Sequence, residues 1–113
     1  MAYIHAQTLA DAVRAQGFVT AQDRLFQMEL ARRMAAGRLA EFAGEPARPL
    51  DIRMRAIGCL RHARAHAAIL SPGSREFFQW YVDGINAFIA TRGEELPLEF
   101  KLAGIRPEPW QVA

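Results

Sequence analysis

Apolar residues recur every three or four positions through most of this sequence, and this spacing constrains the fold more than any other feature. In the clearest stretch, Phe26, Leu30 and Met34 lie four residues apart, so they fall on one face of a helix. Thr20 supplies the hydroxyl that an N-cap requires. The pattern predicts an amphipathic helix over residues 20–36.

The same spacing predicts further helices, each with its own start or stop residue. Thr8 is expected to cap a short helix that ends at Gly17. Gly58 interrupts a later periodic stretch, which forms either one bent helix or two short ones. Ser71 followed by Pro72 is the clearest helix start of the chain. Together these signals predict a single, mainly α segment over residues 1–113 with little or no sheet, with helices at about 8–16, 20–36, 38–43, 49–69 and 71–92 and an extended tail over 94–113.

The predicted helix over residues 71–92 has apolar residues on more than one face. Such a helix is expected at the centre of a fold, because only neighbours on several sides can cover it. Gly84 lies within it and lowers helix stability by about 1 kcal/mol relative to alanine. We therefore expect another backbone or a bulky side chain to approach the helix at Gly84.

Length and charge exclude several classes of protein. A chain of 113 residues has room for one modest domain, which rules out a two-domain enzyme. The formal charge is +2 and the basic residues form no polybasic run, so a clustered nucleic-acid footprint is absent. A helix-turn-helix also fails, because Asp23 stands where that motif packs an aliphatic side chain. No apolar run approaches the roughly 20 residues of a membrane span, and the sequence as given shows no signal peptide.

Few residues form a pattern that could carry chemistry. His62 and His66 are four residues apart, a spacing found in zinc sites, but the arginines beside them would repel a cation. Cys59 is the single cysteine and is expected to be a buried structural thiol. His5 has no orienting group near it in the sequence. The sequence therefore assigns no catalytic, cofactor-binding or metal-ligating residue.

One segment carries a family signature. Residues 17–33 read Gly-Phe-Val-Thr-Ala-Gln-Asp-Arg-Leu-Phe-Gln-Met-Glu-Leu-Ala-Arg-Arg, and Gly-Arg-Leu-Ala-Glu follows at 37–41. These residues resemble the alpha-subunit signature of the penicillin acylase family. Ala2 and Tyr3 depart from the family's Pro-His, so His5 does not match the family's histidine and inherits no role from it. Further segments resemble the family in the same order, at 2–6, 70–72, 81–88, 97–100 and 107–110.

The resemblance implies an N-terminal-nucleophile hydrolase of the αββα fold, made as a precursor, exported to the periplasm and cut into alpha and beta subunits. Its nucleophile would be the serine that begins the beta subunit, with the serine's own amine as the base. This chain resembles the N-terminal part of the alpha subunit, without its first strand and its last helices, so none of those groups lies in it. The alpha-subunit part of the acyl pocket, and the calcium ligand of some members, are expected after Ala113.

By the same resemblance, the segment supports the acyl pocket and the beta subunit of an enzyme that hydrolyses N-acyl amides. Candidate substrates are penicillins, cephalosporin side chains and N-acyl-homoserine lactones. The isolated segment is expected to be inactive, to bind no cofactor, and to self-associate through exposed apolar surface. The alternative is a self-contained, non-catalytic helical interaction domain.

Arg24, Glu29 and Arg33 are the charged residues of the signature beside the apolar face of the helix. Two arrangements remain open from the sequence. The three side chains form either buried ion pairs or a solvent-facing ladder of charges.

Overall fold

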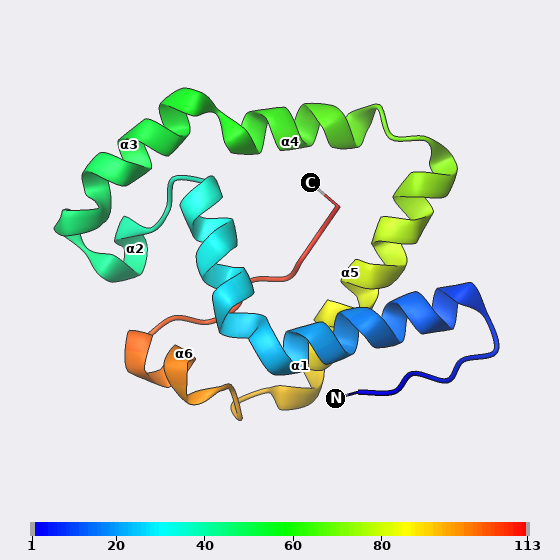
Figure 1. Ribbon diagram of the computed structural model, residues 1–113. Coiled ribbons are helices and arrows are strands. Elements are labelled where there is room, and N and C mark those ends of the chain that lie inside the picture. The colour runs from blue at the N-terminus through cyan, green and yellow to red at the C-terminus, as the bar shows by residue number, and fades with distance from the viewer. Residues whose placement is uncertain (1, 113) are drawn as a thin grey trace.

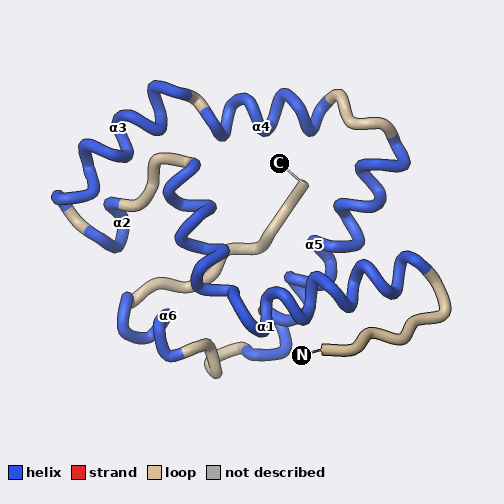
Figure 2. The backbone as a smooth tube through the Cα atoms, in the orientation of Figure 1, coloured by secondary structure: helices blue, strands red, loops and turns tan. Residues whose placement is uncertain are grey.

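The computed structural model describes residues 2–112 of the chain. This part of the chain is mainly helical and contains no strand, which confirms the mainly α prediction (Figure 1, Figure 2). None of the helices in residues 2–112 is long and apolar enough to span a bilayer. The elements in chain order are α1 (Leu9–Ala35), α2 (Ala40–Ala43), the 3₁₀ turn η1 (Glu45–Ala47), α3 (Arg48–Ile57), α4 (Cys59–Ala68), α5 (Pro72–Arg92) and α6 (Leu98–Ala103).

The helices surround the C-terminal segment instead of packing into a bundle. In Figure 1, α3 and α4 follow one another along the top, α5 descends from the end of α4, and α1 crosses α5 below. The radius of gyration is 15.5 Å. A compact domain of this length would have a radius of gyration of about 13 Å. The molecule is therefore an open ring of helices.

The most extensive contact between helices is the crossing of α1 and α5, which occurs at two glycines. A Cβ atom added at Gly84 would overlap the carbonyl oxygen of Arg14 and lie 2.9 Å from the amide nitrogen of Phe18. A Cβ atom added at Gly17 would overlap the carbonyl oxygen of Tyr81. Both glycines are buried within helices. The expected close approach at Gly84 is confirmed, and the approaching group is the backbone of α1.

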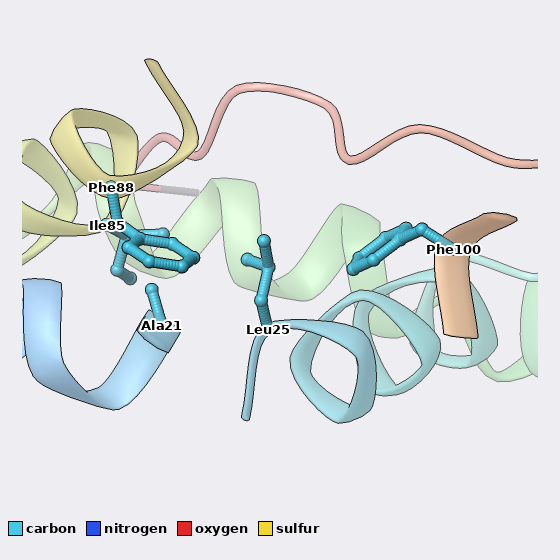
Figure 3. Packing of buried hydrophobic residues seen from close by; sticks show 5 residues of the cluster. All are labelled: Ala21, Leu25, Ile85, Phe88 and Phe100. Atoms are coloured by element: carbon cyan, nitrogen blue, oxygen red, sulfur yellow. The ribbon is translucent and has the colours of Figure 1, made fainter. Parts of the chain in front are cut away.

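A small apolar core lies beside this crossing and joins α1, α5 and α6 (Figure 3). Two edge-to-face aromatic pairs border it: the ring centroids of Phe18 and Phe88 are 5.4 Å apart, and those of Phe26 and Phe100 are 5.2 Å apart. Through Phe100 the core also holds α6 in place. Its buried members, none more than 2% exposed, are Ala21, Leu25, Ile85, Phe88 and Phe100.

The prediction of two helices over 8–16 and 20–36 misplaced their boundary, because α1 is helical through Gly17 and is broken by a kink at Arg24. Thr8 caps it as expected, with its hydroxyl accepting from the amide of Asp11 at 3.1 Å. Gly17 does not end the helix, since it packs against α5. Thr20 is not an N-cap but donates its hydroxyl to the Gln16 carbonyl at 2.8 Å. The bend lies instead at Arg24, where φ is −138° and ψ is 20°.

Of the two alternatives left open for the stretch 49–69, the structure has two helices, α3 and α4, which are separated at Gly58, where φ is +79°. One further range needs correction. The tail over 94–113 is not fully extended, because it contains α6, which Gly104 ends with φ +69°. This six-residue helix is too short to show a helical period in the sequence, and burial of Phe100 stabilises it.

α5 begins as predicted, because the Ser71 hydroxyl accepts from the amide of Ser74 at 3.2 Å. The expectation of a helix covered on most sides holds only for its second half, where Ile85 is buried. In the first half, Phe77 is 41% exposed and Phe78 is 47% exposed. No other helix within residues 2–112 covers Phe77 and Phe78 completely.

Replacing Gly84 with alanine is expected to lower the free energy of unfolding by about 1–3 kcal/mol, because the added methyl group must push α1 away from α5. Gly73→Ala is the matched control in the same helix, since no atom lies within 4 Å of its added Cβ. That variant should be neutral or more stable by up to about 1 kcal/mol. Urea denaturation followed by circular dichroism measures both. Equal stability of the two variants would contradict the close crossing.

Candidate functional site

The most connected group of polar side chains lies where the end of α1 meets the C-terminal segment. Its members are linked by ion pairs from one to the next, and we call the group the charged clamp. It brings together residues of α1, of the α2 region and of the segment after α6. The members are Glu29, Arg32, Arg33, Arg38, Glu41 and Glu108.

Glu29 is the centre of the charged clamp and is fully buried. It lies one helical turn before Arg32 and Arg33, so all three side chains share a face of α1. The Arg33 Nε donates to Glu29 Oε1 at 2.9 Å, Arg32 donates to the other oxygen, and the Arg33 Nη1 reaches Glu41 at 2.8 Å. The hypothesis of buried ion pairs is therefore confirmed for Glu29 and Arg33. It is wrong for Arg24, which is exposed and forms no ion pair within residues 2–112.

Arg38 connects the two outer carboxylates of the clamp. Its Nη1 and Nη2 donate to the two oxygens of Glu108 at 3.0 and 2.6 Å, and its Nε donates to Glu41 at 2.8 Å. These hydrogen bonds from Arg38 hold the pKa of Glu108 and the pKa of Glu41 below their ordinary values. The same bonds raise the pKa of Arg38. Glu41 and Glu108 therefore stay ionised at neutral pH. In this state they accept hydrogen bonds from Arg38 and cannot act as proton donors.

The clamp also fixes the extended segment that follows α6. Arg32 donates to the carbonyl oxygens of Glu108 at 2.9 Å and of Pro109 at 3.0 Å. Its guanidinium carbon lies 4.4 Å from the ring centroid of Trp110. From α5, the Asn86 side chain makes two hydrogen bonds to the backbone of Trp110, of 2.7 and 2.9 Å. The segment is thus tied to both helices of the crossing.

Asp51 is a buried carboxylate with a structural role that the sequence did not reveal. It lies on α3 and accepts from the amides of Leu39 at 2.8 Å and Ala40 at 2.7 Å, at the start of α2. A cap supplied from another helix leaves no local sequence signal. Asn86 and Glu108 were missed as contact residues too, although both lie in segments that resemble the family.

The other residues singled out in the sequence are not brought together into a catalytic or metal site. His62 and His66 are exposed on α4. Among the described residues, no group of three or more His, Cys, Asp or Glu side chains is placed to hold a metal ion. His5 is exposed and makes no hydrogen bond within residues 2–112. Cys59 is half-buried, so the expectation of a buried thiol was wrong.

Three adjoining hollows follow the inner side of α4, and we call them together the inner groove. The middle hollow has a volume of about 630 Å³ and lies between α1, α4 and the segment around Trp110. It shares Leu60 and Arg64 with a hollow of about 440 Å³ at the α3–α4 junction. It shares Ala63 and Trp110 with a hollow of about 360 Å³ beside α5. The groove is large enough to receive an apolar ligand or part of another chain.

Comparison with known proteins identifies similar chains. The family model described as penicillin amidase matches residues 1–113. A penicillin acylase 2 proenzyme from a Pseudomonas species is 48% identical over 109 residues, which cover 96% of this chain and 14% of that protein. An acyl-homoserine lactone acylase from Pseudomonas aeruginosa is 38% identical over 111 residues, which cover 98% of this chain and 13% of that protein.

A solved structure has the same fold. The thermostable penicillin G acylase from Alcaligenes faecalis matches with a TM-score of 0.83 and 31% identity, over 97% of this chain and 60% of that chain. The chain thus spans about one-seventh of the length of the curated relatives it matches, at 14% and 13%.

Glu29→Gln is expected to lower the free energy of unfolding by about 3 kcal/mol, because it removes the negative charge from a buried pair while Arg33 stays buried. Asp11→Asn is the control, since Asp11 pairs with Arg14 on the exposed surface and its loss should cost no more than about 1 kcal/mol. Urea denaturation at pH 7 compares the two. A Glu29 variant no less stable than the Asp11 variant would show that the clamp does not support the fold.

The lowered pKa of Glu108 predicts a pH-dependent contribution to stability. Because the folded-state pKa is depressed, the stabilisation is present above the unfolded-state pKa of about 4.3 and is lost as the pH falls through the folded-state pKa. The difference in unfolding free energy between the parent chain and Glu108→Gln should therefore be largest near pH 7 and shrink below about pH 4.

Urea denaturation from pH 7 to pH 3 measures this difference. Glu94→Gln is the matched control, because Glu94 pairs with Arg106 at an exposed site and should show a small difference throughout. If the difference in unfolding free energy between the parent chain and Glu108→Gln does not change with pH, the ionic role of Glu108 is contradicted.

Proposed function

The chain belongs to the penicillin amidase family, and from this premise we propose that it works as part of an acylase that hydrolyses the amide bond of an N-acyl substrate. The observation that carries the proposal is the similarity, along almost the whole chain, to proteins named penicillin acylase and acyl-homoserine lactone acylase. Two substrate classes follow from those names, the side-chain amides of β-lactams and N-acyl-homoserine lactones.

Within such an enzyme, the segment's role is support for the acyl pocket and for the beta subunit. The charged clamp and the crossing of α1 and α5 give the ring a fixed shape. Exposed apolar side chains outside the inner groove, Phe77 and Ile69 among them, offer surface that another chain can cover.

Three further parts of the proposal concern the parent enzyme. We propose that it is made as a precursor and acts in the periplasm, and the word proenzyme in the name of one relative supports the precursor. We also propose calcium as a cofactor of that enzyme. Calcium requires several oxygen ligands, and among residues 2–112 no group of three or more His, Cys, Asp or Glu side chains is placed to hold a metal ion.

The test compares the full product of the gene that encodes this sequence with the 113-residue chain alone. The full product is expected to release the acyl group from a phenylacetyl anilide, from an N-dodecanoyl-homoserine lactone, or from both. The isolated chain is expected to hydrolyse neither. Product release is followed by absorbance for the anilide and by chromatography for the lactone. A full product that folds but cleaves neither substrate, or an isolated chain that cleaves one, would overturn the proposal.

A pair of variants of the full product tests the supporting role. Arg32→Gln releases the segment at Glu108 and Pro109 from α1, so it should lower the yield of active enzyme. Arg53→Gln removes an exposed arginine of α3 and should leave the yield unchanged. Equal yields of active enzyme would count against structural support by the clamp.

A further inference from the structure

The arm formed by α3 and α4 carries positive charge that no neighbouring acid in the sequence balances. No Asp or Glu occurs between Asp51 and Glu76. Asp51 itself is buried and is used by the amides at the start of α2. The arginines of the intervening stretch are Arg53, Arg55, Arg61, Arg64 and Arg75. An anion is therefore the natural partner of this arm.

The hollow at the α3–α4 junction gathers several of these charges. Its volume is about 440 Å³, and four of its lining side chains are arginines, while none is acidic. Arg38 is occupied by Glu41 and Glu108, and Arg55 donates only its Nε, to the Gly37 carbonyl at 2.8 Å. Arg61 and Arg64 form no ion pair or hydrogen bond with residues 2–112. The guanidinium donors of Arg61 and Arg64, and the Nη groups of Arg55, remain available to a ligand.

The floor of this hollow is apolar and continues into the rest of the inner groove. Leu60 lines both the hollow at the α3–α4 junction and the middle hollow. Ala63 lines both the middle hollow and the hollow beside α5. At the far end the lining is Phe78, Tyr81 and Ile85. The groove follows the ten residues of α4, a helix about 15 Å long. The groove is thus cationic at the α3–α4 junction, mixed in the middle hollow, where Arg32, Arg64 and Glu108 also line it, and mainly apolar beside α5.

We propose that the inner groove binds an amphiphilic carboxylate, with the carboxylate at Arg61 and Arg64 and an unbranched apolar chain along α4. A guanidinium group presents paired donors that match a carboxylate, which favours this anion at the cationic end. Burial of the chain on Leu60, Ala63 and the aromatic end supplies the apolar contribution. Glu108, the acid that lines the middle hollow, is neutralised by Arg38 and does not repel the ligand. The proposal concerns binding and is independent of the acylase activity.

Isothermal titration calorimetry of the purified protein with dodecanoate, at concentrations where it is monomeric, tests the proposal. One molecule is expected to bind per chain. Dodecyltrimethylammonium, with the same chain and a positive head, is expected to bind at least about tenfold more weakly, a difference that charged hydrogen bonds can supply. Equal binding of the two amphiphiles, or no binding of dodecanoate, would overturn the proposal.

Matched variants locate the two ends of the ligand. Arg61→Gln with Arg64→Gln should weaken dodecanoate binding about tenfold, while Arg48→Gln with Arg53→Gln, which removes the same charge from exposed sites outside the groove, should leave it unchanged. Ala63→Trp fills the apolar part of the groove from the exposed side of α4 and should also weaken binding. All these sites are exposed, so the fold should be retained, and circular dichroism checks this. Binding that both pairs weaken equally, or that Ala63→Trp leaves unchanged, would refute the placement.

Discussion

The close crossing of α1 and α5 is the constraint on which the rest of the structure depends. At Gly17 and Gly84 each backbone lies where the other helix would have to place a Cβ atom, so no larger residue fits without separating the helices. This approach brings Leu25 and Ile85 into one core, and Phe100 of α6 completes it. Because the core lies at the crossing, the arm from α2 to α4 extends away from it (Figure 1).

Polar contacts tie the segment after α6 to α1 and α5. The segment after α6 has no regular structure, so its carbonyl groups need donors from elsewhere. Arg32 supplies them, and Asn86 binds the backbone of Trp110 from the opposite helix. The buried charges of Glu29 and Arg33 are tolerated because each has its partners in place. The arrangement serves to position chain segments and offers no proton-transfer chemistry of its own.

Local signals predicted much of the fold, and long-range contacts account for the errors. Thr8 and Ser71 cap helices as the sequence indicated, because an N-cap depends on residues three positions away. Gly17 was misread as a stop, since a glycine can end a helix or admit a neighbouring backbone, and only α5 decides between them. The bond from Arg38 to Glu108 joins residues 70 apart, and no pattern in the sequence indicates such a pair.

The sequence by itself determined that the chain is helical, where most helices begin, and which family it resembles, because helical periodicity, capping and motifs are written in neighbouring residues. Tertiary structure decided that α1 runs through Gly17 and kinks at Arg24, that Glu29 and Arg33 are buried while Arg24 is not, and that the arginines of α3 and α4 line a groove. The physical reason is that burial and charge pairing depend on which distant segments meet. In this chain that meeting is set by the approach of two helices at a pair of glycines.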